Sequence, residues 1–294
     1  MLGSRRVLGE PETALPHGPA KEAVRHLFTC EAASHSTGLS SGELRSFAQR
    51  GWAGPYPLLS SEGVAWACQS YKNAHIRFRR RNLLRTLYQS DAFSRTPWHK
   101  SMHAYLPSFC EIASHPAIVT RVASVLGPDV IAWGVGMSRV RPGQRHRWHV
   151  DVEHVRWPGV TIFLGLKNTS LASSLKVICG SHRIAQVPQA IGVDDDTGAL
   201  TTCKRLDPDC ELVTVKVKEG EFFLFDGRLW HSSHNTRWKW RSAIIAQYAR
   251  PDAAIAIPLN YDQPIRWHSQ QPPCVLVSGQ DRSGVNRLVS PPVT

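Results

Sequence analysis

The chain has 294 residues, of which 42% are hydrophobic and 20% charged, with 21 Gly and 20 Pro; this composition is typical of a globular protein and excludes a disordered or collagen-like chain. No apolar run approaches the roughly 18 residues of a membrane span, and residues 1–16 lack the apolar core of a secretory signal, so we expect no membrane partner. The seven scattered cysteines include no CxxC pair, which argues against a zinc ribbon or a disulfide scaffold and favours a cytoplasmic protein with reduced thiols.

The chain is strongly basic, because 35 Lys and Arg against 23 Asp and Glu give a formal net charge of +12. Such a field attracts nucleic acid, a membrane surface, or an anionic or carrier-linked substrate. The densest basic segments are residues 77–81 and 139–147, and neither is a long Lys/Arg run or a known nucleic-acid motif. We therefore expect an anionic or carrier-linked small molecule as the partner and no nucleic acid.

The N-terminal part predicts helices. Residues 1–38, rich in Gly, Pro and Ser, are expected to be a poorly ordered leader with a short helix near residues 20–28. Serines before a helical apolar spacing, and glycine or proline after it, mark helix starts and stops. We predict three helices in a layer over residues 39–127: one over residues 39–51 that is broken by Gly51–Pro55, one that opens at Ser60–Ala67, and one over His115–Leu126 that is stopped by Gly127 and Pro128.

From residue 128 onwards the pattern changes to short β-branched or aromatic runs bounded by turn residues, which predict strands. The predicted strands are Val130–Val140, Val160–Leu166, Leu175–Cys179, Leu212–Val217, Glu221–Phe225 and Ser242–Tyr248. The polar stretch 184–209, with three consecutive Asp at 194–196, is expected to be a solvated loop. Helices followed by many short strands favour one mainly β domain over residues 39–260, in which a helical layer precedes a β-sandwich or barrel over 128–250, and a wrapping tail over 261–294.

The most informative segment is Trp148-His149-Val150-Asp151. If it is extended, the side chains of His149 and Asp151 share one face and lie about 7 Å apart along the strand, which suits one metal ion. His231 follows Asp151 by 80 residues, after the predicted strand at 221–225, so a second strand can fold back beside the first. Arg241 opens the next apolar strand. A surface His beside a surface Asp remains the alternative for the first motif taken alone.

In combination these segments resemble the phytanoyl-CoA dioxygenase family of Fe(II)/2-oxoglutarate oxygenases. The matching segments, in order, are Leu39–Gly51, Leu58–Ala67, His115–Gly127, Trp148–Asp151, Gly180-Ser181-His182, Gly220–His231 and Arg241. Residues 148–153 are particularly similar to the ectoine hydroxylase branch. The resemblance implies a double-stranded β-helix, also called a jelly roll or cupin-like fold, that uses Fe(II), 2-oxoglutarate and O2.

The resemblance also implies the roles of individual residues. His149, Asp151 and His231 would be the catalytic metal ligands, since two imidazoles and one carboxylate leave positions open on iron. Arg241 would bind the distal carboxylate of 2-oxoglutarate through two parallel hydrogen bonds, and Ser233 could add a hydroxyl. The segment between His231 and the arginine is one residue shorter than is usual in the family, which leaves Arg237 as an alternative.

Candidate substrate contacts flank the metal motif: Arg139, Arg147, Glu153 and His154. Halogenating members of the family replace the carboxylate with a small residue, so Asp151 favours hydroxylation of an unactivated C–H bond of a small molecule, with release of succinate and CO2. Desaturation or oxidative cyclisation in specialised-metabolite biosynthesis is the alternative. A third hypothesis, a non-catalytic cupin-like binder of an anionic partner, gives no reason for His149, Asp151, His231 and Arg241 to occur together.

Overall fold

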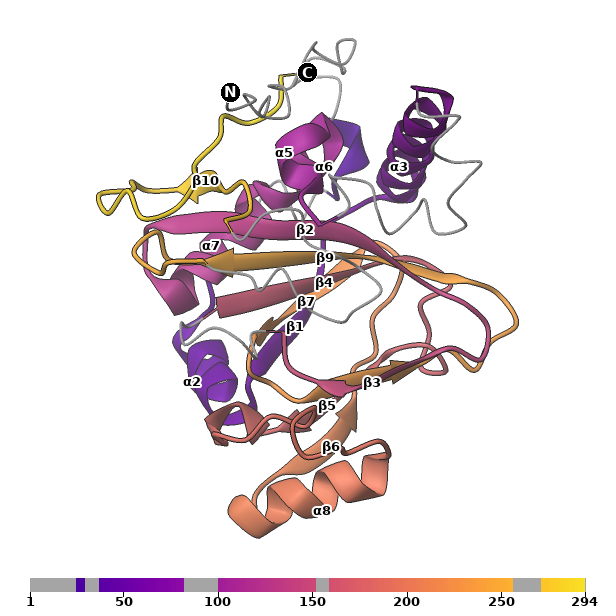
Figure 1. Cartoon of the computed structure of the whole chain (residues 1–294), viewed down its shortest axis with the longest axis vertical. Helices are drawn as coiled ribbons and strands as arrows, with labels where there is room; N and C mark the ends of the chain where they lie inside the picture. The colour runs from indigo at the N-terminus through magenta and orange to yellow at the C-terminus, as the bar shows by residue number, and fades with distance from the viewer. Residues whose placement is uncertain (1–24, 30–36, 82–99, 152–158, 256–270, 294) are drawn as a thin grey trace, which may run out of the picture.

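The computed structural model describes residues 25–29, 37–81, 100–151, 159–255 and 271–293, and within them two antiparallel sheets face each other (Figure 1). The larger sheet contains, in spatial order, β1 (Trp52–Pro57), β7 (Glu221–Asp226), β4 (Gly159–Lys167), β9 (Arg241–Ala249), β2 (Val130–Val140) and β10 (Val275–Ser278). The smaller sheet contains β3 (Arg145–His149), β8 (His231–His234), β5 (Leu175–Cys179) and β6 (Glu211–Thr214). The predicted jelly-roll fold is therefore confirmed.

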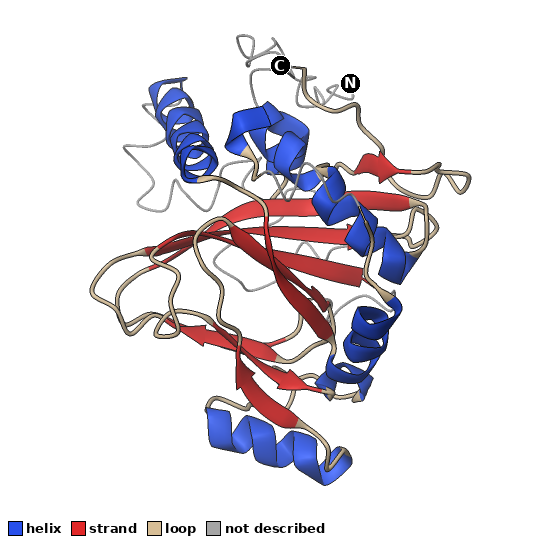
Figure 2. Ribbon diagram, turned by 180° about the vertical axis from the view of Figure 1, so that it is seen from behind, coloured by secondary structure: helices blue, strands red, loops and turns tan. Residues whose placement is uncertain are grey.

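Helices cover the larger sheet on the face that is turned away from the smaller one (Figure 2). They are η1 (Arg25–Leu27), α3 (Ser61–Arg81), α5 (Met102–Tyr105), α6 (Pro107–Ala113) and α7 (Pro116–Leu126). Helix α2 (Ser41–Arg50) lies beside the β1 edge, next to the turn that follows β5 (Figure 1). The short η2 (Ser181–Arg183) follows β5, and α8 (Asp196–Leu206) packs on the outer face of the smaller sheet. No helix among the described residues is long and apolar enough to cross a membrane.

The central strands are apolar on both faces because each face packs against a different layer. In β7, Phe222 and Leu224 pack toward the helices, whereas Phe223 and Phe225 pack toward the smaller sheet. This double burial explains the unbroken apolar run at the centre of β7. It also leaves little room for polar side chains between the sheets, so those that do lie there need a specific partner.

Helix α2 begins and ends as its sequence predicts. Ser40 and Glu43 form a capping box, in which the amide of Glu43 donates to Ser40 Oγ at 3.3 Å and the amide of Ser40 donates to Glu43 Oε2 at 2.8 Å. Gly51 ends the helix with φ +83°, and a Cβ there would lie 2.6 Å from Nδ1 of His182. Glycine at this position therefore serves both the left-handed conformation and the close approach of the turn that follows β5.

The structure corrects the expectation for residues 184–209 and adds elements that the sequence did not predict. The Gly51–Pro55 break opens strand β1, which pairs with β7. Helix α3 opens where it was predicted to open and continues to Arg81, whereas α5 and α6 were not predicted. The stretch 184–209 is not only a loop, because it contains α8, with Asp195 as N-cap. The tail contains β10, which adds to the larger sheet beside β2. Leu27 and Phe28 belong to the main core, so packing begins before residue 39, whereas residues 1–24 lie outside the described part.

Candidate metal centre

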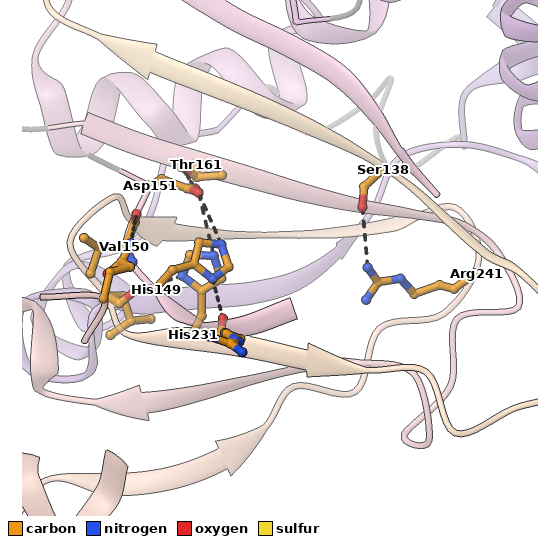
Figure 3. Close-up of polar contacts among 10 residues, drawn as sticks. Ser138, His149, Val150, Asp151, Thr161, His231 and Arg241 are labelled. Carbon is orange, nitrogen blue, oxygen red and sulfur yellow. Dashed lines mark hydrogen bonds and ion pairs between the residues drawn. The ribbon is translucent and has the colours of Figure 1, made fainter. Parts of the chain in front are cut away.

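Two histidines and one carboxylate converge between the sheets (Figure 3). The ligand atoms of His149, Asp151 and His231 all lie within 4.8 Å of one another. Asp151 Oδ1 lies 3.9 Å from Nε2 of His149 and 3.7 Å from Nε2 of His231. Strands β3 and β8 are neighbours, and His149 is the register partner of His231, which brings together residues that are far apart in the sequence.

The route by which Asp151 reaches this position differs from the predicted one. Strand β3 ends at His149, so strand alternation does not place Asp151 beside it. The chain turns after His149, and the amide of Asp151 donates to the carbonyl of Gly227 at 2.9 Å. The carboxylate therefore meets the imidazoles through a turn that is anchored to the connection between β7 and β8.

Both imidazoles are oriented by a backbone carbonyl two residues earlier. Nδ1 of His149 lies 2.8 Å from the carbonyl oxygen of Arg147, and Nδ1 of His231 lies 2.9 Å from that of Leu229. A carbonyl oxygen only accepts, so Nδ1 is the donor in each ring. When the rings are neutral, each Nε2 therefore keeps its lone pair on the side that faces Asp151, which is the tautomer of a metal ligand.

The carboxylate of Asp151 is also oriented. Thr161, on β4, donates its hydroxyl hydrogen to Oδ2 of Asp151 at 2.7 Å. Thr161 is buried between the sheets. With Oδ2 occupied in this way, Oδ1 is the oxygen that faces both histidines.

The charges around the three residues favour their ligand forms. Burial, followed by the proximity of His231, lowers the pKa of His149 to about 4, so this ring is neutral at pH 7. Burial alone would raise the pKa of Asp151, but attraction to His231 and His149 and the hydrogen bond from Thr161 hold it below its ordinary value. The charge of Lys100 also lowers the pKa of this carboxylate; burial lowers the pKa of the lysine, and the charge of Asp151 opposes that effect.

The donor set fits ferrous iron. Iron(II) accepts imidazole nitrogen and carboxylate oxygen as ligands. Two imidazoles and one carboxylate on one side of the ion leave its other coordination positions open for cosubstrate and O2. Here the two Nε2 atoms and Oδ1 face a common point, and each is fixed by a hydrogen bond elsewhere on its own side chain. Among the described residues this is the one group of His, Cys, Asp and Glu side chains that could hold a metal ion.

Arg241 lies between the sheets at the start of β9, some way from the three residues (Figure 3). Only 1% of it is exposed, and its guanidinium donates to the carbonyl of Ser173 at 2.9 Å and to Ser138 Oγ at 3.5 Å. Burial lowers its pKa to about 10, so it stays charged at neutral pH. No carboxylate of the described residues pairs with this buried cation, and its Nε has no partner there, so the site is suited to an anion.

Two other predicted cosubstrate residues have clear positions. Ser233 is buried on β8 two residues after His231, on the same face of the strand, and its hydroxyl has no partner among the described residues. Arg237, the alternative to Arg241, lies on the exposed connection between β8 and β9. Burial therefore favours Arg241 over Arg237 as the cation between the sheets.

The structure does not bring Arg139 and Arg147, two of the predicted substrate contacts, to the three residues. The guanidinium of Arg139 lies 4.9 Å from the centre of the Trp240 ring at the surface. The side chain of Arg147 is 81% exposed and forms an ion pair with Asp194 at 3.4 Å. Glu153 and His154 lie outside the described residues.

The segment after β5 makes hydrogen bonds to the backbone of both ligand segments. The side-chain amide of Gln189 accepts from the amide of Val150 at 3.3 Å and donates to the carbonyl of Val150 at 3.2 Å, so it holds the residue between His149 and Asp151. Ser181 Oγ accepts from the amide of Trp230, next to His231, at 2.9 Å. Trp148 and Trp230 are packing residues that are buried together between the smaller sheet and α8.

Sequence reasoning missed Thr161, Gln189 and Lys100. Thr161 left one usable signal, because it is a polar residue inside an otherwise apolar strand that is buried on both faces. Gln189 and Lys100 act across the fold, and no local pattern marks them.

The sequence matches a family model described as phytanoyl-CoA dioxygenase (PhyH) over residues 47–242. Comparison with curated proteins finds no match. Similar solved structures include a non-heme monooxygenase, ThoJ, in its apo form (18% identity, TM-score 0.58, covering 84% of this chain and 86% of that one). A second is CytC3 with Fe(II) and α-ketoglutarate (19% identity, TM-score 0.57, covering 86% of this chain and 93% of that one). A third is EctD from S. alaskensis with 2-oxoglutarate and 5-hydroxyectoine (17% identity, TM-score 0.55, covering 89% of this chain and 91% of that one).

At these identities the similarity to solved structures establishes the fold, whereas the family model covers more than half of the chain. The chain therefore belongs to the phytanoyl-CoA dioxygenase (PhyH) family and is a dioxygenase that uses Fe(II), 2-oxoglutarate and O2.

Proposed function

We propose that His149, Asp151 and His231 hold the Fe(II) of this dioxygenase and that Arg241, with Ser233, binds the distal carboxylate of 2-oxoglutarate. The observation that carries the proposal is the pairing of a three-ligand group with a buried cation that lacks a carboxylate partner among the described residues, both between the same two sheets. Arginine suits a carboxylate because its planar fork donates two parallel hydrogen bonds.

The chain's own residues prepare the site. Leu229 and Arg147 carbonyls hold the two rings with Nε2 toward the metal, and Thr161 holds the carboxylate with Oδ1 toward it. Such outer contacts fix ligand orientation and raise metal affinity. The apolar side chains of Phe163 and Phe225, packed between the sheets, exclude water from the space beside the ligands. When bound, iron and 2-oxoglutarate would together activate O2, which is the oxidant.

We propose hydroxylation of an unactivated C–H bond of a small molecule, in specialised-metabolite biosynthesis, as the reaction. One oxygen atom of O2 enters the product alcohol and the other enters succinate, while 2-oxoglutarate loses CO2. The carboxylate at position 151 supports this reaction over halogenation, because it fills a coordination position that a halide needs. Six cysteines of the described residues are free thiols, which supports a cytoplasmic location.

The test is succinate release from 2-oxoglutarate in the presence of a panel of candidate small molecules, with ¹⁸O2 and mass spectrometry of the product. A product heavier by one ¹⁸O atom supports hydroxylation. A product that lacks two hydrogens and carries no ¹⁸O shows that the reaction is desaturation or cyclisation instead of hydroxylation. A chlorinated product in the presence of chloride contradicts the proposal.

A further inference from the structure

Three connections meet at the end of the molecule where β8 passes into β9: residues 141–144, 168–174 and 235–240, called here the loop end (Figures 1 and 2). They are joined by hydrogen bonds from Asn235 N to Gln144 O (3.0 Å), from Gly143 N to Asn235 O (2.7 Å), from Thr236 N to Ala172 O (3.0 Å) and from Asn168 Nδ2 to Trp240 O (2.7 Å). The loop end is therefore one connected surface, although its three segments are distant in sequence.

Large apolar side chains stand in solvent on this surface. Trp238 is 74% exposed, Leu171 is 58% exposed and Trp240 is 43% exposed. Exposed tryptophans are costly in water, and a group of them with an exposed leucine marks an interaction surface. None of the three contributes to the packed core of the described residues.

Basic side chains surround these apolar groups. Arg139 and Arg141 place their guanidinium groups 4.9 Å and 5.8 Å from the centre of the Trp240 ring, and Nζ of Lys239 lies 4.4 Å from that of Trp238. The exposed Arg237 adds a further charge. Residues 139–147, 168–174 and 235–241 contain no Asp or Glu. In the described part of the chain these four cations have no carboxylate partner. Glu219, whose carboxylate accepts from the amide of Asn168 at 2.6 Å, pairs with Lys167 instead, so the loop end keeps a net positive charge.

We propose that the loop end docks on the surface of an anionic lipid bilayer. Tryptophan prefers the headgroup region of a bilayer, where its ring is in apolar surroundings and its N–H remains hydrated, and leucine gains by burial beside it. Arginine and lysine next to these rings then lie at the level of lipid phosphates. The cytoplasmic leaflet carries the negative charge that this patch complements.

This proposal goes beyond the expectation from sequence, which excluded a membrane partner because no apolar span is present. A protein that lies on a bilayer needs no such span. The segment Arg237-Trp238-Lys239-Trp240 alternates basic and aromatic residues. Such alternation also occurs where single-stranded nucleic acid binds, but there the rings must offer their faces to bases. Here cations of the protein already occupy ring faces, and Leu171 offers nothing to a base.

The loop end is separate from the metal centre. Strand β3 runs from Arg145, beside the loop end, to His149, a span of about 13 Å at the rise of an extended strand. Docking can therefore be removed without changing the residues that bind iron, and the proposal does not depend on the identity of the substrate.

The experiment is flotation of the full-length, iron-loaded protein with vesicles of phosphatidylcholine alone or of phosphatidylcholine with phosphatidylglycerol. One variant removes apolar anchors, Trp238→Ser/Trp240→Ser, and another reverses charge, Arg237→Glu/Lys239→Glu. The matched control, Lys204→Glu/Leu206→Ser, changes an exposed cation and an exposed leucine on α8. Thermal unfolding and iron content are measured for every variant, to show that each remains folded and loaded.

We expect the wild type and the control to float with anionic vesicles only. Each cation removed should weaken binding about fivefold, and the loss of both tryptophans should weaken it at least as much. Intrinsic fluorescence should shift to shorter wavelength on binding, except in the tryptophan variant. Equal binding to neutral and anionic vesicles, or full binding by the tryptophan variant, overturns the proposal. The proposal is also overturned if the protein binds a single-stranded oligonucleotide but no vesicles, and if the same variants abolish that binding.

Discussion

Thr161 and Asp151 are joined by a 2.7 Å hydrogen bond that leaves one carboxylate oxygen for the histidines and engages the other with the hydroxyl. The contact links β4 of the larger sheet to the turn after β3 of the smaller sheet. It therefore ties the ligand geometry to the packing of the two sheets and sets how many oxygens Asp151 can offer to a metal.

Removing this hydroxyl should release Oδ2. In Thr161→Val, which keeps the side-chain shape, the second oxygen can compete for a coordination position, and metal affinity or turnover should fall about 10- to 100-fold. The anaerobic charge-transfer absorption of the Fe(II)–2-oxoglutarate complex should change with it. Thr161→Ser restores the hydroxyl and should recover both readouts. Wild-type absorption and turnover in Thr161→Val would show that the Thr161 hydroxyl does not position Asp151 for metal binding.

Gln189 should act on the same ligands through the backbone. Its amide group makes two hydrogen bonds to Val150, so Gln189→Ala should weaken Fe(II) binding several-fold and lower stability by about 1–2 kcal/mol. Gln186, three residues earlier on the same loop, has an exposed side chain, and Gln186→Ala is the matched control. Metal titration and thermal unfolding report the two effects. Equal behaviour of the two variants would contradict a positioning role for Gln189.

Arg241 should determine affinity for 2-oxoglutarate and leave the metal in place. Loss of a buried, two-pronged ion pair in Arg241→Ala should weaken cosubstrate binding by about 2–5 kcal/mol. Arg241→Lys keeps the charge without the planar fork and should lie between wild type and Ala. Calorimetric titration of 2-oxoglutarate into the iron-loaded protein measures this. If Arg237→Ala loses affinity and Arg241→Ala does not, the assignment passes to Arg237.

Stability should fall in mild acid because of His103. This side chain is fully buried, its Nε2 donates to the carbonyl of Pro273 at 3.0 Å, and burial lowers its pKa to about 4. Between pH 6.5 and about 4 the unfolded chain binds a proton that the folded chain does not, so stability is complete above pH 6.5 and decreases as the pH falls. The loss amounts to about 3 kcal/mol for this group.

Chemical denaturation across that pH range tests the point. His103→Gln, which cannot titrate, should show a shallower decline by about the same amount. Part of the decline in stability should remain in this variant, because burial also lowers the pKa values of His115 and His146. An identical pH profile for His103→Gln and wild type would contradict the assignment.

The parts of the fold that follow from local pattern were predicted well. Strands β2 and β5 have their predicted limits, because each is a continuous β-branched or apolar run between turn residues. Helix α8 was missed because three consecutive Asp suggested a solvated loop. In the structure Asp195 caps the helix, Asp196 pairs with Lys176, and Ala199 and Cys203 form the buried face. The N-cap residue and the i, i+4 spacing of apolar residues both indicate a helix, but the run of charged residues was given more weight.

For the candidate site, the sequence supplied the residue types and the structure supplied how they are held. Strand order brings His149 beside His231, yet Asp151 reaches them by a turn that strand alternation does not describe. Arg139 and Arg147 were chosen because they are near the motif in sequence, but their side chains lie at the surface. Contacts between distant segments, such as Gln189 with Val150, leave no local trace in a single sequence.

The central claim, that His149, Asp151 and His231 hold the iron, is tested most directly by the Fe(II) stoichiometry of anaerobic protein, measured in His149→Ala, His231→Ala and the control His234→Ala. His234 lies on the same strand as His231 but outside the three-ligand group. The account predicts about one Fe(II) per chain for the wild type and for His234→Ala, and almost none for the other two variants, all with wild-type thermal unfolding in the absence of metal. Full iron binding by His231→Ala, or equal loss in His234→Ala, would contradict it.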